Sequence, residues 1–175
     1  AQQKFPLNLR YDVARFAGEG DQIYLELYYS FDVSALKYIV SGNARQGEAA
    51  VTTLIKRSIN DSIVARQGWR IPFSVNDSSM LLQSRIYSDI FGFLGKPDIY
   101  RVYIVASDVN DPLIKDSMSF ILNIRPIDTA NVTLSDVQLA TSIVPIEKDI
   151  NNRFYKNSYE VKPNPSRLFG IYQPA

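Results

Sequence analysis

Strict alternation of apolar and polar residues is the feature that most constrains the fold of this chain. Between residues 22 and 31, every odd-numbered position from Ile23 to Phe31 is apolar or aromatic, whereas Gln22, Glu26 and Ser30 occupy even-numbered positions. Successive side chains of an extended strand point to opposite faces, so this period of two gathers the apolar residues on one side. We therefore predict a half-buried antiparallel strand over residues 22–31.

Similar patterns recur along the chain and predict further strands. The alternation that begins at residue 7 is interrupted at residues 14–16, which predicts a bulge or a sheet edge there. Asn60 and Asp61 predict the turn of a hairpin. In the segment 76–94, the four-residue spacing of apolar residues leaves a short helix as the alternative to a strand. The predicted strands span residues 7–13, 36–40, 49–59, 62–71, 81–93, 98–107 and 117–125.

About eight strands in the first 125 residues predict an all-β fold, an immunoglobulin-like antiparallel β-sandwich. Five of the nine prolines lie in the final 50 residues, where the alternation becomes sparse. This change predicts a linker over residues 126–133 and a partial second β domain or C-terminal extension over residues 134–175. Its expected strands are residues 134–143 and 154–161.

The composition limits the kinds of catalysis that this chain could carry out. A chain with 46% hydrophobic and 21% charged residues is typical of a packed domain, but this one has neither histidine nor cysteine. The commonest proton shuttles, nucleophiles and soft-metal ligands are thereby missing, so we predict a protein that is not an enzyme, with no catalytic residues and no cofactor. A hydrolase built on a pair of carboxylates is the remaining catalytic hypothesis. The net charge of +1, without a run of lysine or arginine, argues against nucleic acid as a partner.

One acidic loop invites a metal hypothesis. Asp108, Asn110 and Asp111 lie in an Asp-Val-Asn-Asp-Pro segment that resembles the calcium-ligating segment between cadherin domains. The same residue types also make turns between strands, and this alternative predicts no bound metal.

Aromatic residues offer a binding hypothesis. Tyr24 and Tyr28 fall on the even-numbered side of the 22–31 strand, and Tyr38 follows nearby. If exposed, these rings would form a surface that stacks on a glycan or anchors a peptide. The alternative is that both faces of the strand are covered, the second one by the following domain. Trp69 with Arg66 and Arg70 could form a cation–π patch, although a lone tryptophan in a sandwich strand is typically part of the core.

Five stretches together resemble the N-terminal region of the GWxTD-domain proteins, a family of exported bacterial proteins of unassigned activity. They are residues 9–16, 23–30, 100–108, 134–140 and 161–169. The resemblance implies a sandwich that precedes an immunoglobulin-like part and the domain with the GWxTD motif. That motif is absent here, since the only Gly-Trp pair, at residues 68–69, departs from it, so the resemblance supplies no catalytic residues.

From these features we expect a non-enzymatic interaction or scaffolding module of a larger bacterial cell-envelope protein. Its partners would be downstream domains of the same protein or other envelope proteins, with Asp136, residues 163–165 and Phe169 helping to orient the next domain. A glycan- or peptide-binding module is the alternative. No apolar stretch is long enough to cross a bilayer, and a start at Ala1 followed by two glutamines fits a cleaved signal peptide. We therefore expect export to the periplasm or cell envelope.

Overall fold

The computed structural model describes residues 6–76, 85–126, 128, 130–131, 133–149 and 151–163. Strands account for 63% of these residues and helix for 2%, and the paired strands are antiparallel. The predicted fold class, all-β with antiparallel sheets of the sandwich type, is confirmed. The part of the chain that the structure describes contains no helix long and apolar enough to span a membrane.

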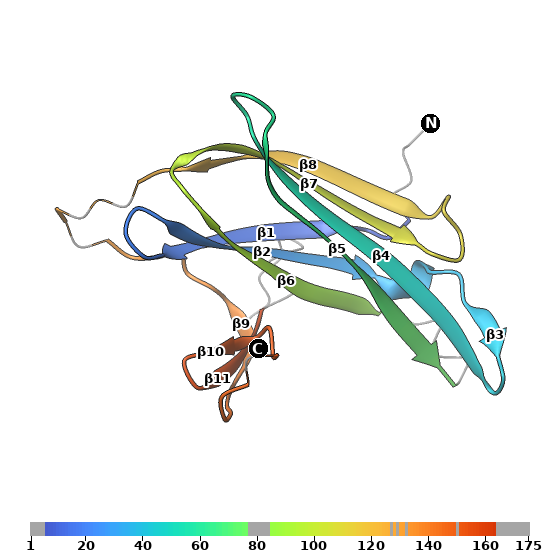
Figure 1. The fold of residues 1–175 in the computed structure, drawn as a ribbon. Helices are drawn as coiled ribbons and strands as arrows, with labels where there is room; N and C mark the ends of the chain where they lie inside the picture. The colour runs from blue at the N-terminus through green and yellow to red at the C-terminus, as the bar shows by residue number, and fades with distance from the viewer. Residues whose placement is uncertain are drawn as a thin grey trace. The chain divides into compact units, whose positions relative to one another are not determined.

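Eleven strands and one short 3-10 helix make up the described fold (Figure 1). The strands that precede residue 125 are β1 (Arg10–Ala17), β2 (Ile23–Asp32), β3 (Ile39–Ser41), β4 (Ala44–Arg57), β5 (Ile63–Val75), β6 (Ile86–Gly95), β7 (Asp98–Asp108) and β8 (Lys115–Ile124). The later strands are β9 (Ala140–Pro145), β10 (Tyr155–Lys156) and β11 (Tyr159–Pro163), and the helix η1 spans Val33–Ala35.

The chain divides into two compact units, each made of several segments of the sequence. Unit 1 contains Ala1–Leu9, Phe31–Tyr87 and Asp98–Ile124, whereas unit 2 contains Arg10–Ser30, Ser88–Pro97 and Arg125–Ala175. The C-terminal segment therefore shares a unit with β1, most of β2 and most of β6.

Unit 1 is built on a five-stranded sheet with the order β3-β4-β7-β8, to which β5 adds beside β4. The β4–β5 and β7–β8 hairpins are both present as predicted (Figure 1), although β4 already begins at Ala44 and β5 continues to Val75. Burial alternates strictly along β4 and β7, so one face of the sheet is packed. The buried row consists of Ala49, Val51, Thr53, Ile55, Tyr100, Val102, Ile104 and Ala106.

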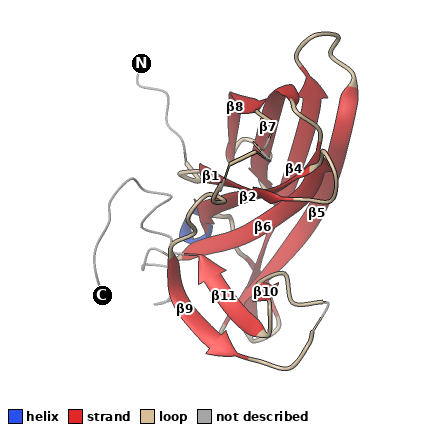
Figure 2. Cartoon of the chain, turned by 90° about the vertical axis from the view of Figure 1, so that its left-hand side faces the viewer, coloured by secondary structure: helices blue, strands red, loops and turns tan. Residues whose placement is uncertain are grey.

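Unit 2 contains two smaller sheets, with the orders β1-β2-β6 and β10-β11-β9. The second of these is the small sheet formed by the C-terminal strands in Figure 2. A buried cluster of Ala14, Tyr28 and Ile90 packs against Phe16 and Phe154. Because Phe154 directly precedes β10, the C-terminal segment helps to cover the sheet formed by β1, β2 and β6.

The packing of the C-terminal segment on this sheet shows that the prediction of a half-buried strand at residues 22–31 is wrong. Glu26 and Ser30, which belong to the polar face, are as buried as their apolar neighbours. The prediction failed because residues of the C-terminal segment cover the middle of the even-numbered face, where Lys156 pairs with Glu26 and Phe154 packs against the cluster that contains Tyr28. Of the two alternatives predicted at residues 14–16, the sheet edge is confirmed, since β1 is the edge strand of the order β1-β2-β6, whereas the bulge is wrong, since β1 pairs with β2 in continuous register from Arg10 to Ala17.

Other boundaries moved for local reasons. The expected strand at 36–40 is reduced to β3, since Leu36 is the C-terminal cap of η1 and residues 37–38 belong to neither element. Residues 86–95 form a strand, which rules out the helical alternative there, while residues 81–84 lie outside the described part. The strand expected at 134–143 begins only at Ala140. The strand expected at 154–161 is divided into β10 and β11, since Asn157 and Ser158 have positive φ angles of 48° and 70°.

Candidate interaction surface

The predicted tyrosine surface does not form as one exposed patch. In unit 2, Tyr24 is 37% exposed but Tyr28 is only 3% exposed. In unit 1, Tyr38 is partly buried and donates a hydrogen bond of 3.1 Å from its hydroxyl to the carbonyl oxygen of Val33. Its ring lies so close to Gly47 that the methyl carbon of an alanine there would come within 2.9 Å of it. Tyr28 and Tyr38 therefore serve packing within their units.

The surroundings of Tyr28 explain its burial. Its hydroxyl donates to the carboxylate of Glu26, which is also buried and forms an ion pair with Lys156. The Lys156 ammonium lies 5.1 Å from the ring centre of Phe16 and 5.8 Å from that of Tyr28. Burial, followed by the hydrogen bond to Glu26, raises the pKa of Tyr28 far above its usual value, so the phenol stays neutral. These contacts are those of a structural ion pair in a covered site.

A second buried carboxylate in unit 2 is arranged in the same way. Asp89 accepts a hydrogen bond of 3.0 Å from the hydroxyl of Tyr29 and forms an ion pair with Arg153. Like Lys156, Arg153 comes from the C-terminal segment. Both buried carboxylates among the described residues of unit 2 are thus paired with cations that lie far away in the sequence.

Asp136 fixes the start of the C-terminal segment to the edge strand β1. Its carboxylate contacts the Nε and Nη2 atoms of Arg15 at 2.9 and 3.1 Å, and accepts a hydrogen bond of 3.0 Å from the Arg15 backbone. The Asp136 N–H in turn donates to the Arg15 carbonyl oxygen at 3.0 Å. The sequence predicts that Asp136 orients the next domain together with residues 163–165 and Phe169; in this structure its contact is with Arg15 of its own unit, while residues 164–165 and Phe169 lie outside the described residues.

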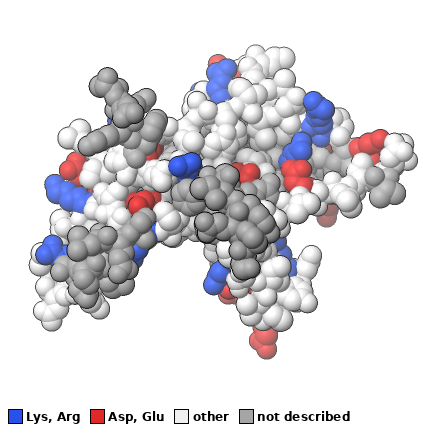
Figure 3. All heavy atoms as spheres, turned by 180° about the vertical axis from the view of Figure 1, so that it is seen from behind, with Lys and Arg blue, Asp and Glu red and all other residues white. Residues whose placement is uncertain are grey.

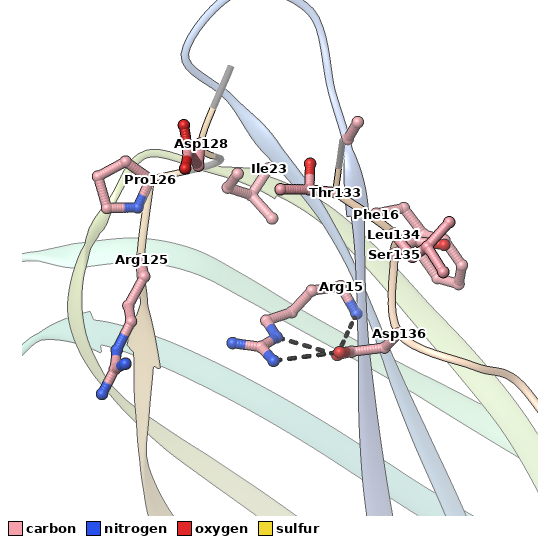
Figure 4. Close-up of a pocket in the computed structure, with 11 residues that line it drawn as sticks. Arg15, Phe16, Ile23, Arg125, Pro126, Asp128, Thr133, Leu134, Ser135 and Asp136 are labelled. Atoms are coloured by element: carbon pink, nitrogen blue, oxygen red, sulfur yellow. Dashed lines mark hydrogen bonds and ion pairs between the residues drawn. The ribbon is translucent and has the colours of Figure 1, made fainter. Parts of the chain in front are cut away.

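A pocket of about 300 Å³ lies beside this ion pair (Figure 4). Arg15 and Asp136 line one side of it, and Arg125, Pro126 and Asp128 line another. The side chain of Asn131 donates a hydrogen bond of 2.7 Å to Asp128 and lowers the pKa of that carboxyl. The charges that line this pocket balance, with Arg15 and Arg125 against Asp128 and Asp136, so they define no ligand class.

The calcium hypothesis concerns the loop between β7 and β8, where backbone N–H groups already donate hydrogen bonds to the Asp108 carboxylate. Asp108 is buried and accepts hydrogen bonds from the backbone N–H groups of Lys37, Asn110 and Asp111. The Asn110 side chain donates to the Lys37 carbonyl oxygen at 2.9 Å, and Asp111 lies 3.5 Å from the Lys37 ammonium. Within the described ranges, no cluster of three or more acidic side chains could hold a metal ion. The three residues close a loop between β7 and β8.

The surface with the most distinctive composition is the unpacked face of the five-stranded sheet, which we call the outer face. It is the side opposite the buried row of β4 and β7. The register places Leu54 opposite Tyr103, and Thr52 opposite Val105. Lys56, Arg101 and Ile121 form a row across β4, β7 and β8. We call Leu54, Tyr103, Val105 and Ile121 the apolar strip.

Cations surround the apolar strip. Arg66 and Arg70 on β5 lie opposite Leu54 and Ala50, and Lys115 on β8 lies opposite Ser107. Together with Lys56 and Arg101, they give the outer face five cations. Two acidic residues partly balance this charge: Glu48 pairs with Arg70 at 2.6 Å, and Asp61 lies 3.7 Å from Arg101. A hydrogen bond to Tyr103 raises the pKa of Arg101. Figure 3 shows both signs of charge interspersed among the described residues of the face that it draws.

A hollow of about 370 Å³ lies at the β3 end of the outer face. Ile39, Gln46, Glu48, Pro72, Ser74 and Asn110 are among its lining residues. It offers an apolar floor and several amide and hydroxyl groups to a side chain of a partner.

Most residues of the outer face were not identified from the sequence. The sequence groups Arg66 and Arg70 with Trp69 as a cation–π patch, but successive residues of a strand alternate, and Trp69 lies on the other face, opposite Val51 of the buried row. The signal that could have found this surface is the set of cations at outward positions of β4, β5 and β7, which requires the register to be known.

Together, the fold and this surface define an all-β protein with an exposed, cation-rimmed sheet face. Comparisons with protein-family models, with curated proteins and with solved structures found no match for this chain.

Proposed function

We propose that the chain is a non-enzymatic interaction module that binds a partner protein through the outer face. The observation that carries the proposal is the apolar strip, in which Val105 is 38% and Ile121 57% exposed and Leu54 and Tyr103 are half-buried, inside a rim of five cations. Apolar side chains surrounded by polar ones are the usual anatomy of a protein interface, and tyrosine and arginine are enriched at its energetic centre.

The charges of the rim favour an acidic partner. Five cations and two acidic residues leave the outer face positive, although the whole chain has a net charge of only +1. A positive rim attracts and orients a negative surface, which raises the association rate and rejects basic surfaces. The β4–β5 and β7–β8 hairpins hold these side chains on a continuous sheet, so little ordering accompanies binding.

The setting of this module is also part of the proposal. The resemblance to GWxTD-domain proteins supports a place in a larger, exported bacterial protein of the cell envelope. The burial of Tyr28 argues against the alternative in which a tyrosine-rich face recognises a glycan.

Affinity capture from a bacterial envelope extract tests the proposal. The double variant Val105→Ser, Ile121→Ser removes the exposed part of the apolar strip. The matched control, Ile143→Ser with Val144→Ser, changes two residues of unit 2 that are 63% and 46% exposed. We expect the first variant to lose partners that the wild-type chain and the control both retain. Equal capture by all three proteins would refute the proposal.

A further inference from the structure

Among the described residues, β5 lies at an edge of the five-stranded sheet. It pairs with β4 from Arg45 opposite Val75 to Lys56 opposite Ile63. In the part of the chain that the structure describes, β4 is the only strand that pairs with it. Most of its 13 residues are exposed or half-exposed on both faces. An edge of this kind is a template for one more strand.

The pairing geometry shows which backbone groups point to the free side. The Glu48 carbonyl oxygen accepts a hydrogen bond of 2.9 Å from Val109, and therefore points away from β5. Glu48 lies opposite Pro72, which has no N–H to donate, so this pair is one of those that do not exchange hydrogen bonds. Because such pairs alternate along an antiparallel ladder, the backbone groups of Arg70, Gly68 and Arg66 also point away from β4.

The same residues carry the charge of this edge. Arg66 and Arg70 are both exposed and lie four positions apart, which corresponds to about 13 Å along a strand. Arg70 holds Glu48 through two contacts of 2.6 and 2.7 Å, whereas Arg66 has no ion pair with any described residue. Gly68 lies midway between them and leaves the centre of the edge open.

This arrangement disfavours a second copy of the chain as the occupant. In an antiparallel pair of two β5 strands centred on Gly68, each Arg66 would lie opposite an Arg70. Like charges directly opposite each other destabilise a strand pair, whereas opposite charges stabilise it. The edge therefore selects an acidic strand over its own copy.

We propose that β5 binds an extended acidic peptide segment of the partner, which adds to the sheet as a further strand. Its backbone pairs with Arg66, Gly68 and Arg70, and acidic side chains four residues apart lie opposite the two arginines. The inference rests on the proposed function, since it names the segment by which a partner of the outer face is held.

The test uses the full chain and a synthetic peptide of nine residues. The peptide has glutamate at its third and seventh positions among alternating valine and threonine, and the control peptide has glutamine at both positions. Amide hydrogen exchange is followed by NMR. We expect the acidic peptide to slow exchange at Arg66, Gly68 and Arg70 by about tenfold or more, with little change at Gln67 and Trp69, which already face β4. The glutamine peptide should bind about tenfold more weakly.

Two variants distinguish the addition of the peptide as a strand from general charge attraction. Gly68→Pro removes one outward N–H and leaves the β4 pairing, while Arg66→Glu reverses one charge without altering the backbone. Each should weaken peptide binding by about tenfold, and Lys148→Glu, the same charge change outside the sheet, should not. Unaltered exchange at the three amides, equal binding by Arg66→Glu, or protection that grows with protein concentration without peptide would each overturn the inference.

The failure of this inference and of the proposed function are distinguishable. If the apolar-strip variant loses its partner but the peptide protects no β5 amide, the edge inference fails and the proposed function stands. If the peptide protects β5 but the apolar-strip variant captures the same partners as the wild-type chain, the proposed function fails.

Discussion

The Arg15 guanidinium contacts the Asp136 carboxylate at 2.9 and 3.1 Å, the Arg15 N–H donates to that carboxylate at 3.0 Å, and the Asp136 N–H donates to the Arg15 carbonyl oxygen at 3.0 Å. The residues are 121 positions apart in the sequence. This pair joins the start of the C-terminal segment to the edge of the β1-β2-β6 sheet, so that edge strand is partly covered.

Asp136→Asn should loosen this junction without unfolding the protein. Both side chains are partly exposed, so we expect a loss of only about 0.5–1 kcal/mol in the free energy of unfolding. Exchange of the Asp136 and Arg15 amides should become clearly faster. The control Asp21→Asn breaks the more exposed contact with Lys96, at 3.4 Å, and should change neither quantity measurably. Equal exchange rates in wild-type and Asp136→Asn proteins would contradict this role.

Removing the cation from the buried Glu26–Lys156 pair should destabilise the protein strongly. Lys156→Met leaves the Glu26 carboxylate buried without a positive partner, and we expect a loss of about 3 kcal/mol in urea unfolding. The double variant Glu26→Gln, Lys156→Met should recover much of this loss, because no buried charge then remains. A double variant no more stable than Lys156→Met would show that the charge is not the cause.

Two glycines of the same sheet should respond differently to alanine. At Gly47 a methyl carbon would lie 2.9 Å from the ring of Tyr38, whereas at Gly68 the nearest atoms are at 3.5 and 3.6 Å. Gly47→Ala should therefore cost about 1–2 kcal/mol, while Gly68→Ala should be neutral or slightly stabilising. Thermal unfolding of both variants checks the contrast, and similar melting temperatures would mean that Tyr38 is not held as described.

Asp108 should matter for stability and not for calcium binding. Its carboxylate accepts three backbone hydrogen bonds, so Asp108→Ala should lower the free energy of unfolding by about 2–3 kcal/mol. Millimolar calcium should leave the melting temperature of the wild-type chain unchanged, since no acidic cluster among the described residues is available to it. A rise in melting temperature that Asp108→Asn abolishes would restore the calcium hypothesis.

Local patterns predicted most of the strands, because period two and turn residues are encoded over a few positions. The Asn60–Asp61 turn and the hairpins around it are examples. The residues that cover a strand are not encoded locally. The even-numbered side of β2 suggested an exposed tyrosine face, yet Tyr28 is buried among residues such as Phe154, more than 120 positions later. The outer face escaped prediction for a related reason, since its cations become neighbours only when β5, β4 and β7 are in register.

Site-specific photo-crosslinking tests the central claim most directly. A photoreactive amino acid is placed at Ile121, on the outer face, and in a second protein at Ile143, which is similarly exposed in unit 2. In envelope extract, the probe at position 121 should form a discrete adduct with a partner protein, and the probe at position 143 should not. An adduct at position 143 alone, or none at position 121, would contradict an interaction through the outer face.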